Sequence, residues 1–231
     1  MLRIEKLNHY YGGSHTLWDI DLDVPQGQCT CLMGRNGVGK TTLINCIMGL
    51  LPLTSGRMFL ERKEITKLSA DRRARLGVGY VPQGRQIFPL LTVEENLILG
   101  LSTGKERLKK IPELIFELFP VLHTMIGRLG GDLSGGQQQQ LAIGRALVLQ
   151  PSLLILDEPT EGIQPNIVKE IGAIIDRLRI QLGMTVLLVE QKLNFTRNVA
   201  DRFAILDRGQ IVAAENIEKL DNNLIRNYLT V

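Results

Sequence analysis

Apolar and polar positions alternate in two different ways along the chain, and each way predicts a different kind of strand. Residues 2–7 and 19–24 alternate apolar with polar side chains, which is typical of strands with one solvated face. Short, almost continuously apolar segments indicate strands that are buried on both faces. These segments are residues 28–33, 153–156, 184–189 and 203–206. Because helical patterns separate them, we expect an α/β fold with a largely parallel sheet covered on both faces.

Apolar residues at helical spacing predict helices over residues 41–51 and 167–182, and a helical region between residues 92 and 129. Within that region four residues form one apolar stripe: Ile111, Leu114, Ile115 and Leu118. The stripe lacks the dense basic face of a membrane-surface helix. It therefore predicts a helix that packs on the core.

The charge balance argues against a nucleic-acid binder. The chain of 231 residues has 27 basic and 24 acidic residues, a net charge of +3. The short basic run at Arg72, Arg73 and Arg75 is interpreted as a solvated face.

The chain has no run of 18 apolar residues, so we expect no segment that spans a bilayer. Its first residues also lack the apolar core of a signal peptide. Cys29, Cys31 and Cys46 are too few for a disulfide framework or a metal site, and we expect them to be buried apolar residues in a reducing compartment. Together these features predict a protein kept in the cytosol.

Residues 34–42 read GRNGVGKTT and match the phosphate-loop pattern G-x-x-x-x-G-K-[ST]. A predicted strand precedes the loop and a predicted helix follows it. Glycines let backbone N–H groups surround a triphosphate, and the helix N-terminus adds partial positive charge. Lys40 is expected on the outer phosphates and Thr41 on Mg²⁺. The candidate nucleotide contacts of this loop are Gly34, Asn36, Gly37, Gly39, Lys40, Thr41 and Thr42.

An acidic pair follows the apolar run at residues 153–156. A buried strand would deliver Asp157 to its carboxyl end, where ligands bind in such sheets. We expect Asp157 to hold the Mg²⁺ shell and Glu158 to orient and activate the attacking water. Beside the phosphate loop, this pair makes hydrolysis of a nucleoside triphosphate the leading hypothesis.

A second candidate anion site begins another predicted helix. Residues 133–137 read LSGGQ, and Ser134, Gly135, Gly136 and Gln137 place a hydroxyl and backbone amides at a helix N-terminus. A plain helix cap is the alternative, but two glycines are a poor choice for a cap.

With LSGGQ beside GRNGVGKTT and LLILDEP, the chain resembles the ABC ATPase family over essentially its whole length. The resemblance implies a P-loop core at residues 1–84 and 150–215 with a small N-terminal antiparallel sheet. It also implies a helical lobe at residues 85–149, and we expect a short C-terminal helix at residues 216–231. In that family two cassettes pack head to tail, so the LSGGQ residues are expected to act on ATP held by a partner.

Other roles carry over from the resemblance one residue at a time. Tyr11 matches the aromatic residue that stacks on adenine, with Tyr10 as the neighbouring alternative. Gln83 matches the glutamine that reaches Mg²⁺ and the water. Two positions depart from the family: Gln164 stands near the usual aspartate, and Gln191 replaces the usual histidine. Gln191 can still sense the γ-phosphate by hydrogen bonding, although it cannot become a cation.

DEPTEGI and LLVEQ resemble the paired ATPases of branched-chain amino-acid importers, and longer phrases resemble the urea-importer branch of that group. The resemblance implies a peripheral subunit on the cytoplasmic face of the membrane, driven by ATP and Mg²⁺. Its expected partners are a second ATPase, alike or different, and permease subunits that contact residues 84–97, from Gly84 to Leu97. A solute-binding protein would act indirectly. A soluble ABC ATPase and a non-hydrolysing nucleotide sensor remain the alternatives.

Overall fold

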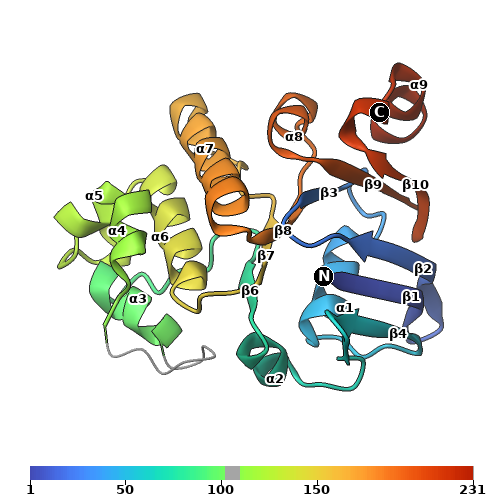
Figure 1. The fold of residues 1–231 in the computed structure, drawn as a ribbon, viewed down its shortest axis with the longest axis horizontal. Coiled ribbons are helices and arrows are strands. Elements are labelled where there is room, and N and C mark those ends of the chain that lie inside the picture. The colour runs from blue at the N-terminus through green and yellow to red at the C-terminus, as the bar shows by residue number, and fades with distance from the viewer. Residues whose placement is uncertain (102–109, 231) are drawn as a thin grey trace.

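The computed structural model describes residues 1–101 and 110–230 (Figure 1). Residues 102–109 fall inside the predicted helical region 92–129, and Val231 ends the predicted C-terminal helix, so those parts of both predictions lie outside the described residues. Within the described ranges, no helix combines the length and the apolar character needed to cross a membrane.

The main sheet has six strands in the order β10-β9-β3-β8-β7-β6. Its members are β3 (Cys29–Met33), β6 (Val78–Val81), β7 (Leu153–Asp157), β8 (Thr185–Val189), β9 (Arg202–Asp207) and β10 (Gln210–Asn216). Only the pairing of β10 with β9 is antiparallel among these strands. The predicted α/β fold with a largely parallel sheet is therefore confirmed.

A smaller antiparallel sheet has the order β2-β1-β4-β5. It is formed by β1 (Leu2–Tyr11), β2 (Ser14–Val24), β4 (Ser55–Leu60) and β5 (Lys63–Glu64). The alternation in the N-terminal strands buries Leu2, Ile4 and Leu7 and leaves their neighbours more exposed. This small sheet packs with α1 (Lys40–Met48) over one face of the main sheet.

The two faces of the main sheet belong to two different hydrophobic clusters. Because side chains alternate along a strand, Cys29 and Cys31 join the cluster of α6 (Gly135–Leu147), α7 (Pro165–Leu182) and α8 (Leu193–Val199). Leu32 joins the opposite cluster, with α1 and the small sheet. All three cysteines are buried and free, as predicted. The sheet is thus covered on both faces, which fixes its strands rigidly.

The helical lobe lies to one side of the main sheet (Figure 1). It contains α3 (Val93–Leu101), α4 (Glu113–Leu118), α5 (Pro120–Thr124), a 3₁₀ turn (Gly130–Asp132) and α6. Three members of the predicted stripe lie on α4, and only Ile111 falls outside it. Ile111 precedes Pro112, and Pro residues favour extended backbone before them, so α4 begins only at Glu113. A new helix starts at Pro120 because Phe119 is not helical. After β10 come a 3₁₀ turn (Ile217–Lys219), α9 (Asn222–Leu224) and a π-helical turn (Ile225–Leu229).

The basic run on α2 (Ala70–Arg75) corrects one prediction. Arg72 and Arg75 are exposed, but Arg73 is only 2% exposed. Its guanidinium donates to the carbonyls of Cys46 and Ile47 at 2.7 and 2.6 Å. It also donates to the carbonyls of the loop before α2, at Thr66 and Leu68. Spacing alone did not reveal this, because two of the acceptors lie at the end of α1, far from Arg73 in the sequence.

Replacing Arg73 by Ala is expected to lower the free energy of unfolding by more than about 2 kcal/mol, because four carbonyls lose a charged donor in a buried place. Chemical denaturation measures this change. Arg72→Ala, on the exposed side of the same helix, is the matched control and should change stability by less than about 0.5 kcal/mol. Equal effects of the two substitutions would contradict the structural role of Arg73.

Candidate functional site

The carboxyl ends of neighbouring parallel strands meet at one edge of the main sheet and border a cavity of about 640 Å³. Strand β3 leads into the glycine-rich loop, β7 ends at Asp157, and β6 and β8 are followed closely by Gln83 and Gln191. The cavity is lined by Asn36, Gly37, Gly39, Lys40, Thr41, Thr42, Gln83, Glu158 and Gln191, among others. Segments distant in the sequence thus converge on one site.

The glycine-rich loop has a backbone that only glycine adopts without strain. Gly34 and Gly39 have φ values of 152° and 112°. A Cβ on Gly34 would lie 2.3 Å from the carbonyl oxygen of Leu206, so no side chain fits there. The Lys40 ammonium folds over the loop and donates to the carbonyls of Gly34 and Arg35 at 2.8 and 2.9 Å. Burial lowers the pKa of Lys40, and nearby carboxylates oppose that shift. The loop therefore holds a fixed cation at the cavity wall.

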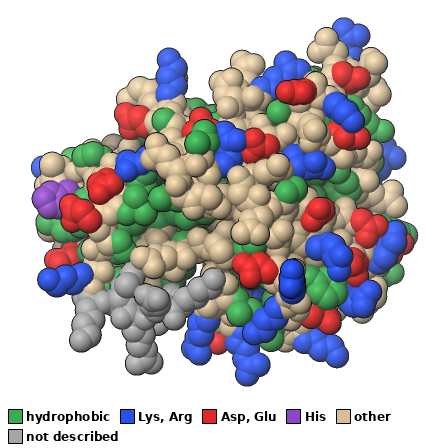
Figure 2. Space-filling view, in the orientation of Figure 1, with side chains coloured by type: hydrophobic (Ala, Val, Ile, Leu, Met, Phe, Trp, Pro, Cys, Tyr) green, Lys and Arg blue, Asp and Glu red, His purple; other side chains and the backbone are tan. Residues whose placement is uncertain are grey.

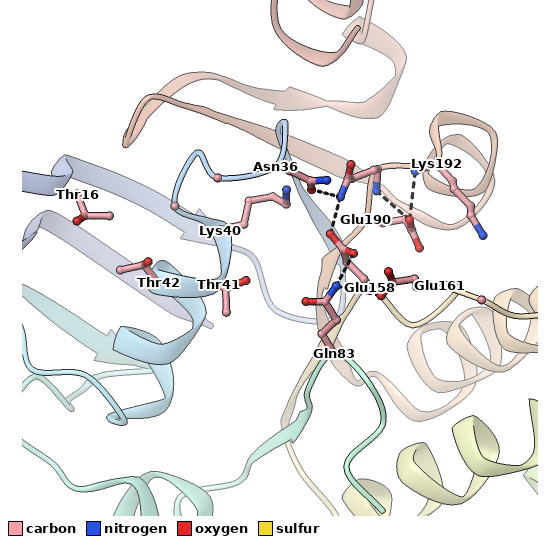
Figure 3. Close-up of a pocket in the computed structure, with 14 residues that line it drawn as sticks. Thr16, Asn36, Lys40, Thr41, Thr42, Gln83, Glu158, Glu161, Glu190 and Lys192 are labelled. Atoms are coloured by element: carbon pink, nitrogen blue, oxygen red, sulfur yellow. Dashed lines mark hydrogen bonds between the residues drawn. The ribbon is translucent and has the colours of Figure 1, made fainter. Parts of the chain in front are cut away.

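Two glutamines hold the carboxylate of Glu158 (Figure 3). The side-chain amide of Gln191 donates to one oxygen of Glu158 at 2.6 Å and to the side chain of Asn36 at 2.8 Å. The amide of Gln83 donates to the other oxygen at 3.1 Å and also to Glu161 at 2.9 Å. Glu158 itself has a φ of 48°, an uncommon value for a residue with a side chain. The candidate base is thus fixed between the segments that follow β6 and β8.

Asp157 lies beneath this cluster and is only 3% exposed. Its Oδ2 is buried without a hydrogen-bond partner. Burial raises the pKa of Asp157 to about 6, and repulsion from Glu158 adds to the shift, while Lys40 opposes it. This unpaired carboxylate oxygen, the hydroxyl of Thr41 and the side-chain oxygen of Gln83 are oxygen donors of the kind that Mg²⁺ prefers, and Thr41 and Gln83 line the cavity. The residues present therefore fit a divalent cation.

The raised pKa of Asp157 means that its ionised form lowers the stability of the folded protein, which can be tested. Because the folded-state pKa of Asp157 lies above its ordinary value of 3.8, the protonated form is favoured on folding. That contribution is present at low pH and is lost as pH rises through about 6. Asp157→Asn removes the charge, so at pH 7.5 without metal or nucleotide it should unfold at higher temperature than wild type, by an amount corresponding to about 2 kcal/mol.

The difference between the two proteins should shrink as the pH falls from about 6 to 3.8, and below 3.8 Asp157 is protonated in both the folded and the unfolded state. Thermal unfolding in a chelating buffer at several pH values measures it. A lower unfolding temperature for Asp157→Asn at pH 7.5 would show that the carboxylate stabilises the empty site.

The LSGGQ residues form a separate site. Ser134 caps α6: its hydroxyl accepts from the backbone of Gln137 at 3.4 Å, and the Gln137 side chain accepts from the backbone of Ser134 at 2.9 Å. With Gly135 and Gly136, these residues line a pocket of about 390 Å³ distinct from the larger cavity. A Cβ on Gly136 would lie 2.9 Å from Ile167, so the helix start stays bare. Within one chain, the two anion sites are not brought together.

The predicted aromatic contact is not part of the cavity lining. The Tyr11 ring is 50% exposed and packs edge-on against His9, with ring centroids 4.7 Å apart. Tyr10 stacks on His15. Thr16, on the next strand, lines the cavity instead.

Gln164, at one of the two unusual positions, lies directly before α7 and lines the LSGGQ pocket. Gln164 is therefore not among the residues that line the larger cavity. Gln191, at the other unusual position, does line that cavity.

Sequence reasoning missed several residues that line the cavity: Thr16, Glu161, Gly162, Glu190 and Lys192. Glu161 could have been found, because it follows Glu158 in the same turn. Glu190 directly follows the apolar strand β8, as Asp157 ends β7, and that signal was also available.

Comparison with known proteins identifies the family of the chain. A family model described as "ABC transporter" matches residues 17–161. The chain is 41% identical over 213 residues to the high-affinity branched-chain amino acid transport ATP-binding protein BraG of Pseudomonas aeruginosa, covering 92% of this chain and 91% of that protein. It is 40% identical over 212 residues to the probable branched-chain amino acid transport ATP-binding protein LivF of Archaeoglobus fulgidus, covering 91% and 90%.

Two solved structures are similar over nearly the whole chain. A nucleotide-free ATP-binding cassette from an ABC transporter has a TM-score of 0.88 at 30% identity and covers 98% of this chain and 95% of its own. A dimeric ATP-binding cassette in a post-hydrolysis state, bound to ADP and Pi, has a TM-score of 0.83 at 26% identity and covers 94% and 99%.

Proposed function

The chain belongs to the ABC transporter family of ATP-binding proteins, whose function is ATP hydrolysis, and from this membership we propose that it powers a membrane importer. The observation that carries the proposal is the position of Glu158, held at the ends of parallel strands beside the phosphate loop. The two alternatives, a soluble ABC ATPase and a non-hydrolysing nucleotide sensor, are not favoured, because the relatives are transporter subunits and Glu158 is present.

The proposed roles follow from the contacts in the cavity. Glu158 accepts a proton from the water that attacks the γ-phosphate. Gln191 and Gln83 hold that carboxylate, and they are the groups best placed to feel whether a γ-phosphate is present. Lys40 binds the outer phosphates. Asp157, Thr41 and Gln83 would hold Mg²⁺, which neutralises charge on the phosphate oxygens when it is bound.

We propose that the LSGGQ pocket completes the nucleotide site of a second cassette. Ser134, Gly135 and Gly136 offer a hydroxyl and bare backbone amides, yet they line a pocket separate from the cavity that contains Lys40. The guanidinium of Arg85 lies beside Gly135, but the phosphate loop lines the other cavity. An anion site without a phosphate loop of its own is explained if the triphosphate is supplied from outside the chain. Pairing with a different ATPase is favoured in the cell, since the resemblance is to paired ATPases.

The permease would dock on an apolar groove in the helical lobe. The groove has a volume of about 290 Å³, and its lining includes Phe88, Leu99 and Arg145. Phe88 is 48% exposed and lies within the predicted docking segment, residues 84–97. The segment is fixed to the lobe, because the buried Asn96 exchanges hydrogen bonds with the backbone of Phe88 and Arg145 donates to Gln86. One short segment therefore connects Gln83 in the cavity to the groove.

Phe88→Asp is expected to abolish association with the permease subunits, because a carboxylate would enter an apolar contact. Recovery of the permease with the purified ATPase measures this. Ile180→Asp is the matched control, since Ile180 is a 70% exposed apolar residue on α7, away from the groove. Full recovery of the permease with Phe88→Asp would rule out this docking surface.

The proposed cargo class is branched-chain amino acids or small amides such as urea. Support for the first comes from BraG and LivF, and support for urea comes only from the longer sequence phrases. The subunit would act on the cytoplasmic face of the membrane. Uptake of labelled leucine and of labelled urea should be compared in cells lacking this chain, complemented with wild type or Glu158→Gln. A solute that wild-type-complemented cells take up and Glu158→Gln cells do not is identified as the cargo. Unchanged uptake of both would reject the cargo class.

A further inference from the structure

Glu190 is a buried carboxylate at the edge of the cavity, and the roles proposed above leave it unused. It directly follows β8, is 3% exposed and lines the cavity close to the phosphate loop. Its side chain accepts hydrogen bonds from three groups on two different segments. Burying a carboxylate without such donors would be strongly unfavourable. These three hydrogen bonds therefore offset the cost of burying Glu190.

One oxygen of Glu190 anchors the turn that contains the candidate base. The hydroxyl of Thr160, which is fully buried, donates to this oxygen at 2.6 Å. The ammonium of Lys192 donates to the carbonyl of Thr160 at 2.8 Å. Thr160 lies two residues after Glu158, in a turn closed by a backbone hydrogen bond from Glu161 to Glu158 at 3.1 Å. Glu190 and Lys192 thus fix this turn against the end of β8.

The other oxygen of Glu190 anchors the segment that holds the base. It accepts from the backbone N–H groups of Gln191 and Lys192 at 2.8 and 3.2 Å. The side chain of Gln191 in turn donates to Glu158 at 2.6 Å. The same carboxylate therefore contacts both the turn that carries Glu158 and the backbone of its hydrogen-bond partner.

We propose that Glu190 is a positioning residue for ATP hydrolysis, which fixes Glu158 and Gln191 relative to one another. The proposal rests on the assignment of Glu158 as the base. Glu190 acts through other residues, because its oxygens are taken up by Thr160 and the backbone after β8. A change at Glu190 should slow the chemical step and leave nucleotide binding nearly unchanged, since the contacts of Lys40 are untouched.

An amide is a poorer partner here than the carboxylate. The two carboxylate oxygens accept from all three donors, whereas Gln has a single acceptor oxygen and an NH₂ group that donates. In Glu190→Gln, the amide oxygen can keep the two backbone N–H groups only if the NH₂ group faces the hydroxyl of Thr160. That hydroxyl must then accept instead of donating, and the charge that strengthens all three hydrogen bonds is lost. The substitution keeps the volume of the side chain, so it disturbs the hydrogen bonds and not the packing. Thr160→Val removes one of the three donors by a different change of similar size.

The test measures steady-state ATP turnover of the assembled transporter carrying Glu190→Gln or Thr160→Val, each also combined with Gln191→Ala. We expect the Glu190→Gln substitution to lower kcat at least about 10-fold, because small misplacements of a base are costly. Thr160→Val should lower it in the same direction, and KM for ATP should stay within about 3-fold. In the Gln191→Ala background the further loss from Glu190→Gln should be clearly smaller than in the wild-type background, because the Gln191 side chain that Glu190 helps to position is already gone.

A merely structural role predicts something else. Glu190→Gln would then lower kcat by the same factor in both backgrounds, together with the unfolding temperature, and that result would overturn the proposal. Unchanged kcat would overturn it as well. Glu158→Gln, measured in the same series, separates the two assignments. An active Glu158→Gln beside a slow Glu190→Gln would reject the base and leave the coupling of Glu190 to Gln191 standing.

Discussion

Glu158→Gln is expected to lower ATP turnover by about 10²–10⁴-fold while ATP binding is retained. The amide has the shape of the carboxylate but cannot accept a proton from water. Both oxygens of Glu158 already accept from glutamine amides, at 2.6 and 3.1 Å, so the wild-type side chain is held in one orientation. Lys40 and the glycine-rich loop do not depend on that charge for their geometry, because Lys40 donates to loop carbonyls.

Single-turnover hydrolysis and equilibrium binding of ATP, measured on the same preparations, check this expectation. Glu161→Gln is the matched control, since Glu161 also lines the cavity and also accepts from Gln83. It should keep most of the activity, because it lacks the second contact to Gln191 that fixes Glu158. If Glu161→Gln were inactive and Glu158→Gln active, the two carboxylates would have to exchange roles.

Lys40→Met is expected to weaken ATP binding by at least about 100-fold, because a buried charged donor to the phosphates is worth about 3 kcal/mol. Lys40 is 6% exposed and lies among carboxylates, so its ammonium is the cation that balances them at the phosphate loop. Titration calorimetry measures the binding, and the fluorescence of Trp18, the only tryptophan in the chain, gives a second readout.

Lys192→Met is the matched control for Lys40→Met. Lys192 also lines the cavity, but its ammonium donates to the carbonyl of Thr160 and not to the phosphate loop. It should change the affinity for ATP by less than about 10-fold. Equal losses from both substitutions would indicate that general positive charge, and not the loop position, holds the nucleotide.

The elements of the main sheet could be predicted because the signals are local. A continuous apolar strand and a glycine-rich loop define β3 and the residues after it, and a similar run defines β7 and Asp157. The same argument failed for Arg73, whose acceptors include carbonyls of α1 that are more than twenty residues away in the sequence. A run of basic residues in the sequence does not indicate which distant backbone carbonyls their side chains contact.

Within the candidate site, sequence motifs predicted the residue types but not their contacts. Gln83, Glu158 and Gln191 come from three segments, and the parallel order of the sheet brings them together. The role proposed for Glu190 depends on Thr160, thirty residues earlier, and no pattern within either segment connects them. These contacts depend on how the strands of the main sheet are aligned with one another, which the residue types alone do not show.

The separation of the two anion sites also could not be deduced from spacing. LSGGQ lies only about twenty residues before Asp157, yet Ser134 lines a different pocket from Lys40. The helical lobe holds α6 to one side of the sheet (Figure 1). Gly162 lines both pockets. Because the two pockets of one chain are separate, we propose that each nucleotide site is shared between two chains.

The most direct test of that claim is the mass of Glu158→Gln in solution, with and without ATP, alone and mixed with a candidate paired ATPase. We expect ATP to double the sedimenting mass of Glu158→Gln, either alone or in the mixture with the paired ATPase. Ser134→Arg in the same background should stay at the mass of one chain while still binding ATP, because it blocks only the LSGGQ pocket. An ATP-dependent dimer that forms equally well with Ser134→Arg, or no dimer in any sample at saturating ATP, would contradict the shared nucleotide site.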